Sequence, residues 1–348
     1  MELLIYLFVY ILTIWFIFFP KSLPSNYFFI FWLSTAMSLS FIIRSSIGET
    51  NSADIDNYIF YMTAVPGLEI SFNYLLREFI FWFGIRFLHN IIGDGATVFV
   101  FLDLILYLLI YRGFSLCKKA FYPQLDQANI QYLFFAVLLF FPYVLGMHNT
   151  YRQILAATVF LISIGLIGNR KTIKGYLVSL VAVFIHNASG LFLPLLMITT
   201  KSKFIQYSSF LMLIPVIIFL LTVSDSNSDF ITREGFEIGQ TIKYMYLIVF
   251  TFLLGALLFL ELKIEKRKNK IFVGLFFISY VIYLFTVFSI SSEQAQRLSF
   301  YIFCMLFPFM GYYCSDRFKP RIITNLIFFH LSLAPLLLIY NTTIDVSL

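Results

Sequence analysis

Charged residues are scarce in this chain. Only 12% of its 348 residues are Asp, Glu, Lys or Arg, whereas 60% are hydrophobic. Soluble domains contain about 25% charged and about 45–50% apolar residues, so this composition excludes a soluble globular protein. It predicts instead an all-α polytopic membrane protein, in which each crossing helix uses about 20 mostly apolar residues.

Cysteine is also rare, with three residues at Cys117, Cys304 and Cys314. These positions form no paired spacings, so we expect neither a structural disulfide nor a zinc site. At about 20 residues per crossing, the length holds about ten to twelve transmembrane helices and leaves no room for a soluble domain. We therefore expect residues 1–348 to form a single transmembrane domain.

Ten apolar runs are long enough to cross a membrane. The first begins after one acidic residue and has no small-residue cleavage site behind it, so we interpret it as a retained helix rather than a signal peptide. The runs cover residues 2–20, 27–43, 96–112, 129–147, 152–168, 204–223, 242–260, 271–290, 297–314 and 321–341.

Two further segments do not fit a simple crossing. Residues 72–92 contain Arg77, Glu78, Arg86 and His89 among aromatic residues, and because such charge is costly in hydrocarbon we place this helix in the membrane interface. Residues 175–199 are interrupted by a polar stretch at His186, Asn187 and Ser189. This pattern predicts a broken or re-entrant helix lining a cavity, and the alternative is a kinked ordinary helix.

The distribution of Lys and Arg decides how these segments are counted. Cytoplasmic loops of membrane proteins carry an excess of positive charge. With the N-terminus outside, 72–92 in the interface and 175–199 entering and leaving on the inner side, most of the 24 cations lie inside. A single crossing by 175–199 would put the cationic block at 261–270 outside, so the charge pattern favours the re-entrant arrangement.

The remaining polar residues fall at the outer ends of the predicted helices. The first group contains Asp54, Asp56, Tyr58 and Tyr61 in the loop after the second helix. A carboxylate beside a membrane cavity can accept a proton from a sugar hydroxyl if its pKa is raised. A solvated loop explains the same residues without any function.

Two arginines enter apolar runs from this outer side. Arg152 stands in the first turn of its helix between Tyr151 and Gln153, where a cation opposes the helix dipole unless an anion binds there. Arg297 follows Glu293 by four residues at the start of another run. Together the guanidinium groups suit a clamp for a diphosphate. The alternatives are a snorkelling arginine and a surface ion pair with Glu293.

These groups, in this order, resemble the EpsG and Wzy-type polysaccharide polymerases of bacterial inner membranes. The likeness lies in the Asp54–Tyr58 loop, the Tyr151-Arg152-Gln153 helix start, the segment from 184 to 189, and the Arg297-Leu-Ser-Phe-Tyr301 stretch. It implies a multi-pass glycosyltransferase with a GT-C-like helical bundle in the bacterial inner membrane, whose active site faces the periplasm or exterior.

The resemblance also implies the substrates. Such enzymes move a growing glycan from undecaprenyl diphosphate onto a second undecaprenyl-diphosphate-linked repeat unit. We expect no metal, no cofactor and no nucleic acid partner, and a chain-length regulator protein as a possible partner. The predicted catalytic residues are Arg152 and Arg297 on the donor diphosphate and Asp56 or His186 as the base, with Asp56 slightly preferred and His186 alternatively a core residue. The predicted substrate-binding residues are Asp54, Tyr58, Tyr61, Tyr151, Gln153, Ser189, Glu293 and Tyr301.

Two other functions fit parts of the same pattern. A transporter or flippase of lipid-linked oligosaccharides would also use arginines and a broken helix, but it would favour inverted repeats, and the chain shows no convincing internal repeat. A membrane-bound glycan O-acyltransferase would use a histidine base. The products formed from a short lipid-linked repeat unit separate the three functions.

Overall fold

The computed structural model describes residues 2–20, 23–45, 53–63, 78–148, 150–193, 203, 207, 292–317 and 320–344, and all regular elements within them are helices. The α-helices are α1 (Glu2–Phe18), α2 (Ser25–Ser45), α3 (Ala53–Thr63), α5 (Phe79–Ile92), α6 (Gly95–Phe121), α7 (Gln131–Ala136), α8 (Phe141–His148), α9 (Tyr151–Gly168), α10 (Thr172–Ile185), α15 (Ser292–Arg317) and α16 (Arg321–Ile344). Short 3-10 helices are η1 (Gln127–Ile130), η2 (Val137–Leu139) and η3 (Asn187–Phe192).

Within the described part of the chain, three helices are long and apolar enough to cross a membrane, namely α2, α6 and α9. A bent pair made of Gln127–Leu139 and Phe141–His148 brings the number to four. The prediction of an all-α polytopic membrane protein is confirmed. The count of ten to twelve crossings stays a prediction, because most of 204–223 and all of 242–260 and 271–290 lie outside the described residues.

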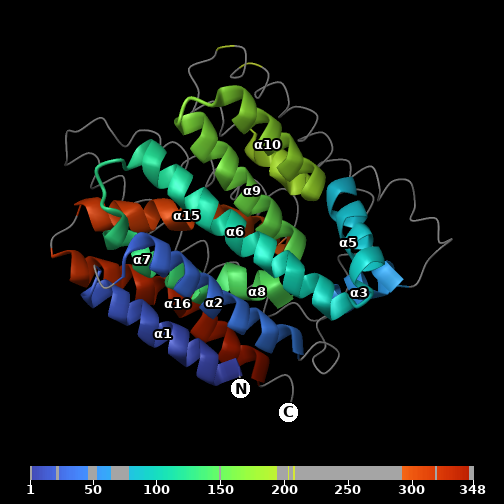
Figure 1. The fold of residues 1–348 in the computed structure, drawn as a ribbon, viewed down its shortest axis with the longest axis horizontal. Helices are drawn as coiled ribbons and strands as arrows, with labels where there is room; N and C mark the ends of the chain where they lie inside the picture. The colour runs from blue at the N-terminus through green and yellow to red at the C-terminus, as the bar shows by residue number, and fades with distance from the viewer. Residues whose placement is uncertain are drawn as a thin grey trace.

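Helix α9 is the centre of the bundle. Of its 18 residues, 83% are buried, and it packs against α6, α10 and α15. In Figure 1, α6, α9 and α10 run side by side, and α1, α2 and α16 form a second group below them. Because α9 is covered by protein on nearly every side, a polar side chain at its start is held in a fixed environment.

Two glycines allow the neighbours of α9 to approach closely. A Cβ atom on Gly165 would stand 2.7 Å from the Cβ of Leu116 on α6, and one on Gly175 would stand 2.5 Å from Ile167. Small residues at helix interfaces let backbones come together in membranes, where packing rather than hydrophobicity drives association. Ser163 uses the short distance to donate a hydrogen bond to the carbonyl of Gly175, at 2.7 Å.

The predicted run at 129–147 is interrupted rather than straight. Its two parts meet at Phe140 at an angle of 48°. Pro142 follows the break, and proline has no N–H to bond the carbonyl of residue 138, so the helical ladder stops there. The bend leads the chain through α8 to the start of α9.

The two ends of the bundle differ in their polar residues. Lys118 and Lys119 lie in the last turn of α6, and Arg170 and Lys171 lie in the turn between α9 and α10. Asn169 ties these two places together by donating to the carbonyl of Leu116 at 2.9 Å. The opposite end, where α9 begins, is called the Arg152 end below. The lysine-rich end is thus opposite Arg152, as the charge pattern predicts, while the face of the membrane to which each end belongs stays a prediction.

Helix α5 lies at the Arg152 end beside α3, beyond the end of α10 (Figure 1). Gly93 ends α5 in the left-handed conformation with φ of 83°, and Asp94 then starts α6 by accepting a hydrogen bond from the backbone of Thr97 at 2.8 Å. The predicted interfacial segment 72–92 is therefore helical over Phe79–Ile92. Residues 72–77 lie outside the described ranges, and the interfacial placement stays a prediction.

Candidate active site

The carboxylate of Glu78 joins two side chains that come from distant parts of the sequence. Glu78 stands directly before α5, and 9% of its side chain is exposed. Its Oε2 atom accepts a hydrogen bond from Nη1 of Arg152 in an ion pair. Its Oε1 atom lies 2.6 Å from Nδ1 of His186. One carboxylate therefore links the start of α9 to the end of α10.

Glu78 is ionised at neutral pH. Burial acts to raise the pKa of its carboxyl group, but the hydrogen bond from His186, the positive charge of a protonated His186, the positive charge of Arg152 and the backbone N–H of Asn187 outweigh burial and lower the pKa below its ordinary value. An ionised carboxylate only accepts hydrogen bonds, so Nδ1 of His186 carries the shared proton. In the neutral imidazole the lone pair is then on Nε2, where a proton acceptor needs it.

Arg152 is held by aromatic rings as well as by Glu78. Its Nε donates to the hydroxyl of Tyr58 on α3 at 3.0 Å. The guanidinium carbon lies 5.3 Å from the ring centre of Tyr58, 5.9 Å from that of Phe81 and 5.2 Å from that of Trp82. Such rings attract a cation through their quadrupole. The side chain remains 22% exposed, and among the described residues Nη2 has no acceptor.

His186 occupies the break that follows α10. Its backbone is extended, with φ of −153° and ψ of 120°, and the 3-10 helix η3 follows directly. The carbonyl of Ala182 accepts the last helical hydrogen bond of α10, from the backbone N–H of His186 at 2.9 Å, and a second one from Ser189 Oγ at 3.0 Å. The break is thus stabilised locally, and the His186 side chain is 17% exposed. Residues 194–202 lie outside the described ranges, so the re-entrant course stays a prediction.

Helix α15 fixes this break from the other side. The hydroxyl of Tyr301 donates to Ser189 Oγ at 2.7 Å, and the ring of Tyr301 stacks on Phe192 with centres 4.6 Å apart. Arg297 lies one helical turn before Tyr301, or about 6 Å along the axis. The backbone of α15 therefore brings Arg297 to the Arg152 end, although the side chain of Arg297 lies outside the described part of the structure.

The predicted site residues fall into three groups. Arg152 and His186 bond to Glu78, Tyr58 bonds to Arg152, and Ser189 and Tyr301 bond to each other. Tyr61 is 47% exposed with its ring edge-on to Trp82, whereas Tyr151 and Gln153 are buried at the start of α9. The side chains outside the described residues are those of Asp54, Asp56, Glu293 and Arg297. The backbone around the two aspartates is helical, in α3, rather than the loop that we expected.

Glu78 is the residue that the sequence reasoning missed. In the sequence it is one of several charges, with Arg77, Arg86 and His89, on a predicted interfacial helix. The signal was its position directly before the apolar stretch Phe79–Phe83, since a carboxylate at a helix start is favoured by the dipole. An arginine inside a helix start also needs a counter-charge, and Glu78 provides it.

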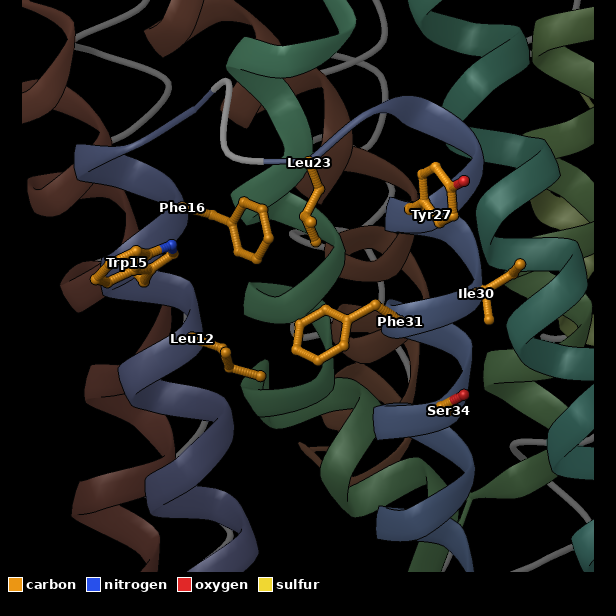
Figure 2. Close-up of a pocket in the computed structure, with 8 residues that line it drawn as sticks. All are labelled: Leu12, Trp15, Phe16, Leu23, Tyr27, Ile30, Phe31 and Ser34. Carbon is orange, nitrogen blue, oxygen red and sulfur yellow. The ribbon is translucent and has the colours of Figure 1, made fainter.

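Among the described residues, no group of three or more His, Cys, Asp or Glu side chains is placed to hold a metal ion. The described part of the chain does contain an open hollow of about 690 Å³ between α1 and α2. Figure 2 shows Phe16, Leu23 and Phe31 pointing into the space between these helices. Leu23 stands at the opposite end of α2 from Arg44, so this apolar hollow is separate from the Glu78 cluster.

Comparison with known protein families matches this chain to the EpsG family. The model of the EpsG family matches residues 29–346, which is nearly the whole chain and includes Tyr58, Glu78, Arg152 and His186. No curated protein and no solved structure matches the sequence.

Proposed function

This chain belongs to the EpsG family, and from that premise we propose that it polymerises lipid-linked oligosaccharide repeat units into a surface polysaccharide. Membership supports a membrane-bound glycosyltransferase of the polysaccharide polymerase type. The finer proposal is that the donor is an undecaprenyl-diphosphate-linked glycan and the acceptor a second undecaprenyl-diphosphate-linked repeat unit. The observation that carries it is Glu78, which joins a cation suited to a diphosphate to an imidazole suited to a hydroxyl.

Arg152 is the proposed ligand of the donor diphosphate. Its guanidinium keeps N–H donors beyond those used by Glu78 and Tyr58, and its side chain is partly exposed. Arginine binds phosphate oxygens through paired N–H groups and stays charged near lipid. Arg297, whose helix starts at the same end, is the proposed second ligand.

His186 is the proposed general base. The oxygen of the acceptor hydroxyl attacks the anomeric carbon of the donor, and its proton passes to Nε2 of His186. The bond between the anomeric carbon and the diphosphate oxygen breaks, and the electron pair leaves with the diphosphate, whose growing charge Arg152 stabilises. A hydrogen bond from Nδ1 to Glu78 fixes the imidazole in the tautomer that this step requires.

This assignment reverses the order of the two candidate bases. The sequence slightly preferred Asp56 over His186. His186 has a buried carboxylate partner and a free Nε2 among the described residues, which is the arrangement of a base oriented by a third group. Asp56 remains the second candidate, on the same helix as Tyr58.

The remaining parts of the proposal follow from the charge pattern and the family likeness. The protein works in the bacterial inner membrane with the Arg152 end toward the periplasm or exterior, without a metal, on a GT-C-like bundle and with a chain-length regulator as a protein partner. A flippase would move the substrate unchanged, and an O-acyltransferase would add an acyl group to it.

The experiment is a polymerisation assay with the purified protein in nanodiscs and a short undecaprenyl-diphosphate-linked repeat unit. Wild-type protein is expected to produce longer glycans. His186→Asn should reduce the rate by about 100-fold, the scale of general acid or base catalysis. Arg152→Lys should also reduce it by about 100-fold, the scale for loss of a group that stabilises transition-state charge. Arg112→Lys, an exposed arginine on α6, is the matched control and should keep the wild-type rate. Wild-type rates in both site variants contradict the proposal, as does an acylated or unchanged product from wild-type protein.

A further inference from the structure

A second arginine lies at the same end of the bundle and is fully buried. Arg44 is in the last turn of α2, with 2% of its side chain exposed, and Asp103 on α6 has none. Nε of Arg44 donates to Asp103 Oδ2 at 2.8 Å and Nη2 donates to Oδ1 at 2.9 Å. Ser40 adds a hydrogen bond to Oδ2 at 2.6 Å. This paired geometry fixes the direction of the guanidinium plane.

Arg44 also contacts the end of α8 and the start of α9. Nη1 of Arg44 donates to the backbone carbonyl of Met147 at 2.7 Å, in the last turn of α8. The guanidinium carbon lies 5.6 Å from the ring centre of Tyr151, the first residue of α9. The next residue in the chain is Arg152. The Arg44–Asp103 pair thus contacts the chain on both sides of the turn that leads to Arg152.

An aromatic layer connects the two arginines. The guanidinium carbon of Arg44 lies 5.1 Å from the ring centre of Phe99, whose ring stacks on that of Tyr58 with centres 6.2 Å apart. Arg152 lies over the ring of Tyr58 and donates to its hydroxyl. Phe99 and Tyr58 are both buried, so the order Arg44, Phe99, Tyr58, Arg152 is a continuous packed contact.

We propose that Arg44 and Asp103 are positioning residues for the polymerase reaction, which hold Arg152 in the direction that binds the donor diphosphate. This proposal rests on the proposed function of Arg152. A charged pair inside a membrane protein is costly to build and marks a functional region by default. The alternative is that the pair only stabilises the fold, and an apolar replacement would then serve equally well, because well-packed hydrophobic residues often replace a buried ion pair without loss of stability.

The test uses the double variant Arg44→Met/Asp103→Leu, which removes both charges together. We expect it to insert and to keep a Tm close to that of wild-type protein, while the KM for the donor rises about tenfold, kcat falls and the KM for the acceptor changes little. Both donor effects are expected because Arg152 binds the diphosphate before the reaction and stabilises its growing charge during it. Wild-type KM values for both substrates in a folded double variant overturn the proposal.

A second variant keeps the test decisive if the double variant does not fold. Phe99→Leu interrupts the aromatic layer and leaves both charges in place, and Phe114→Leu changes an equally buried phenylalanine near the other end of α6. The donor KM should rise in Phe99→Leu and stay at the wild-type value in Phe114→Leu. Equal donor KM values in the two variants contradict the positioning role. Full activity in Arg152→Lys refutes the proposed function instead, so the two failures are distinguishable.

Discussion

Arg44 and Arg152 stand at the same end of the bundle, and each pairs with one carboxylate, yet their surroundings differ. Arg44 and Asp103 are almost completely buried, and hydrogen bonds use Nε, Nη1 and Nη2 of the arginine. Arg152 and His186 are about one fifth exposed and share one carboxylate, that of Glu78. The first pair satisfies its own atoms, whereas the second leaves Nη2 and Nε2 without partners among the described residues.

This difference in burial supports our proposal that Arg44 and Asp103 are a positioning pair and that Arg152 and His186 belong to a ligand site. A buried arginine whose three nitrogens each have an acceptor is closed to a ligand from solvent, so its contribution is to geometry. An arginine held by one carboxylate oxygen and three aromatic rings keeps its charge in place and still offers donors to an anion. We therefore propose that Glu78, Arg152 and His186 carry the chemistry and that Arg44 and Asp103 support it.

The largest effect is expected from removing one partner of the buried Arg44–Asp103 ion pair. Asp103→Ala leaves the charge of Arg44 buried without a partner, which costs about 3–5 kcal/mol in buried pairs. We expect most of the folded protein to be lost from the membrane fraction, measured by size-exclusion chromatography in detergent. Folded Asp103→Ala protein at the wild-type yield would show that water or lipid headgroups reach Arg44, and the contrast between the two arginines would disappear.

Substitution of Glu78 is expected to affect folding less than Asp103→Ala does, but to reduce activity strongly. Glu78→Gln keeps the shape of the side chain but removes the charge that fixes the proton on Nδ1 of His186. We expect the polymerisation rate to fall by about 100-fold, the scale of general base catalysis, while the protein stays folded. Asp94→Asn, at an exposed helix start, is the control and should keep its activity. An active Glu78→Gln enzyme would leave Asp56 as the stronger candidate base.

The smallest effect is a dependence of stability on pH. The pKa of Glu78 is lower in the folded protein than its ordinary value of about 4.3. A carboxyl group whose pKa is lower in the folded protein stabilises the fold at pH values above its pKa in the unfolded chain. This stabilisation is lost as the pH falls through its pKa in the folded protein. The Tm difference between wild-type and Glu78→Gln protein should be constant from pH 7 to about pH 5 and shrink below pH 4. A Tm difference that grows as the pH falls would contradict an ionised Glu78 in the folded protein.

Much of the fold was predictable because a helix that crosses a lipid bilayer needs about 20 mostly apolar residues. Long apolar runs at 27–43, 96–112 and 152–168 correspond to α2, α6 and α9, although α6 extends to Phe121 beyond the first cations. The break at His186 was also predictable, since Asn187, Ser189 and Gly190 favour turns. Helix length and turn position depend on neighbouring residues in the chain, so both can be predicted from the sequence.

Glu78 was not predictable in the same way, because its role depends on packing between distant elements. It lies 74 positions before Arg152 and 108 before His186 in the chain. The same holds for Arg44 and Asp103, which are 59 positions apart. The sequence pattern of a carboxylate next to an apolar helix is the same whether the carboxylate faces water or an arginine. The partners of Glu78 are therefore known only from the packing of α5 against α10.

The most direct test of the central claim is a structure of the protein in nanodiscs with a bound undecaprenyl-diphosphate-linked repeat unit. We predict a diphosphate oxygen within hydrogen-bond distance of Arg152, an acceptor hydroxyl or its water near Nε2 of His186, and Nδ1 of His186 still bonded to Glu78. A diphosphate bound elsewhere, with Arg152 and Glu78 enclosed by protein alone, would contradict the account.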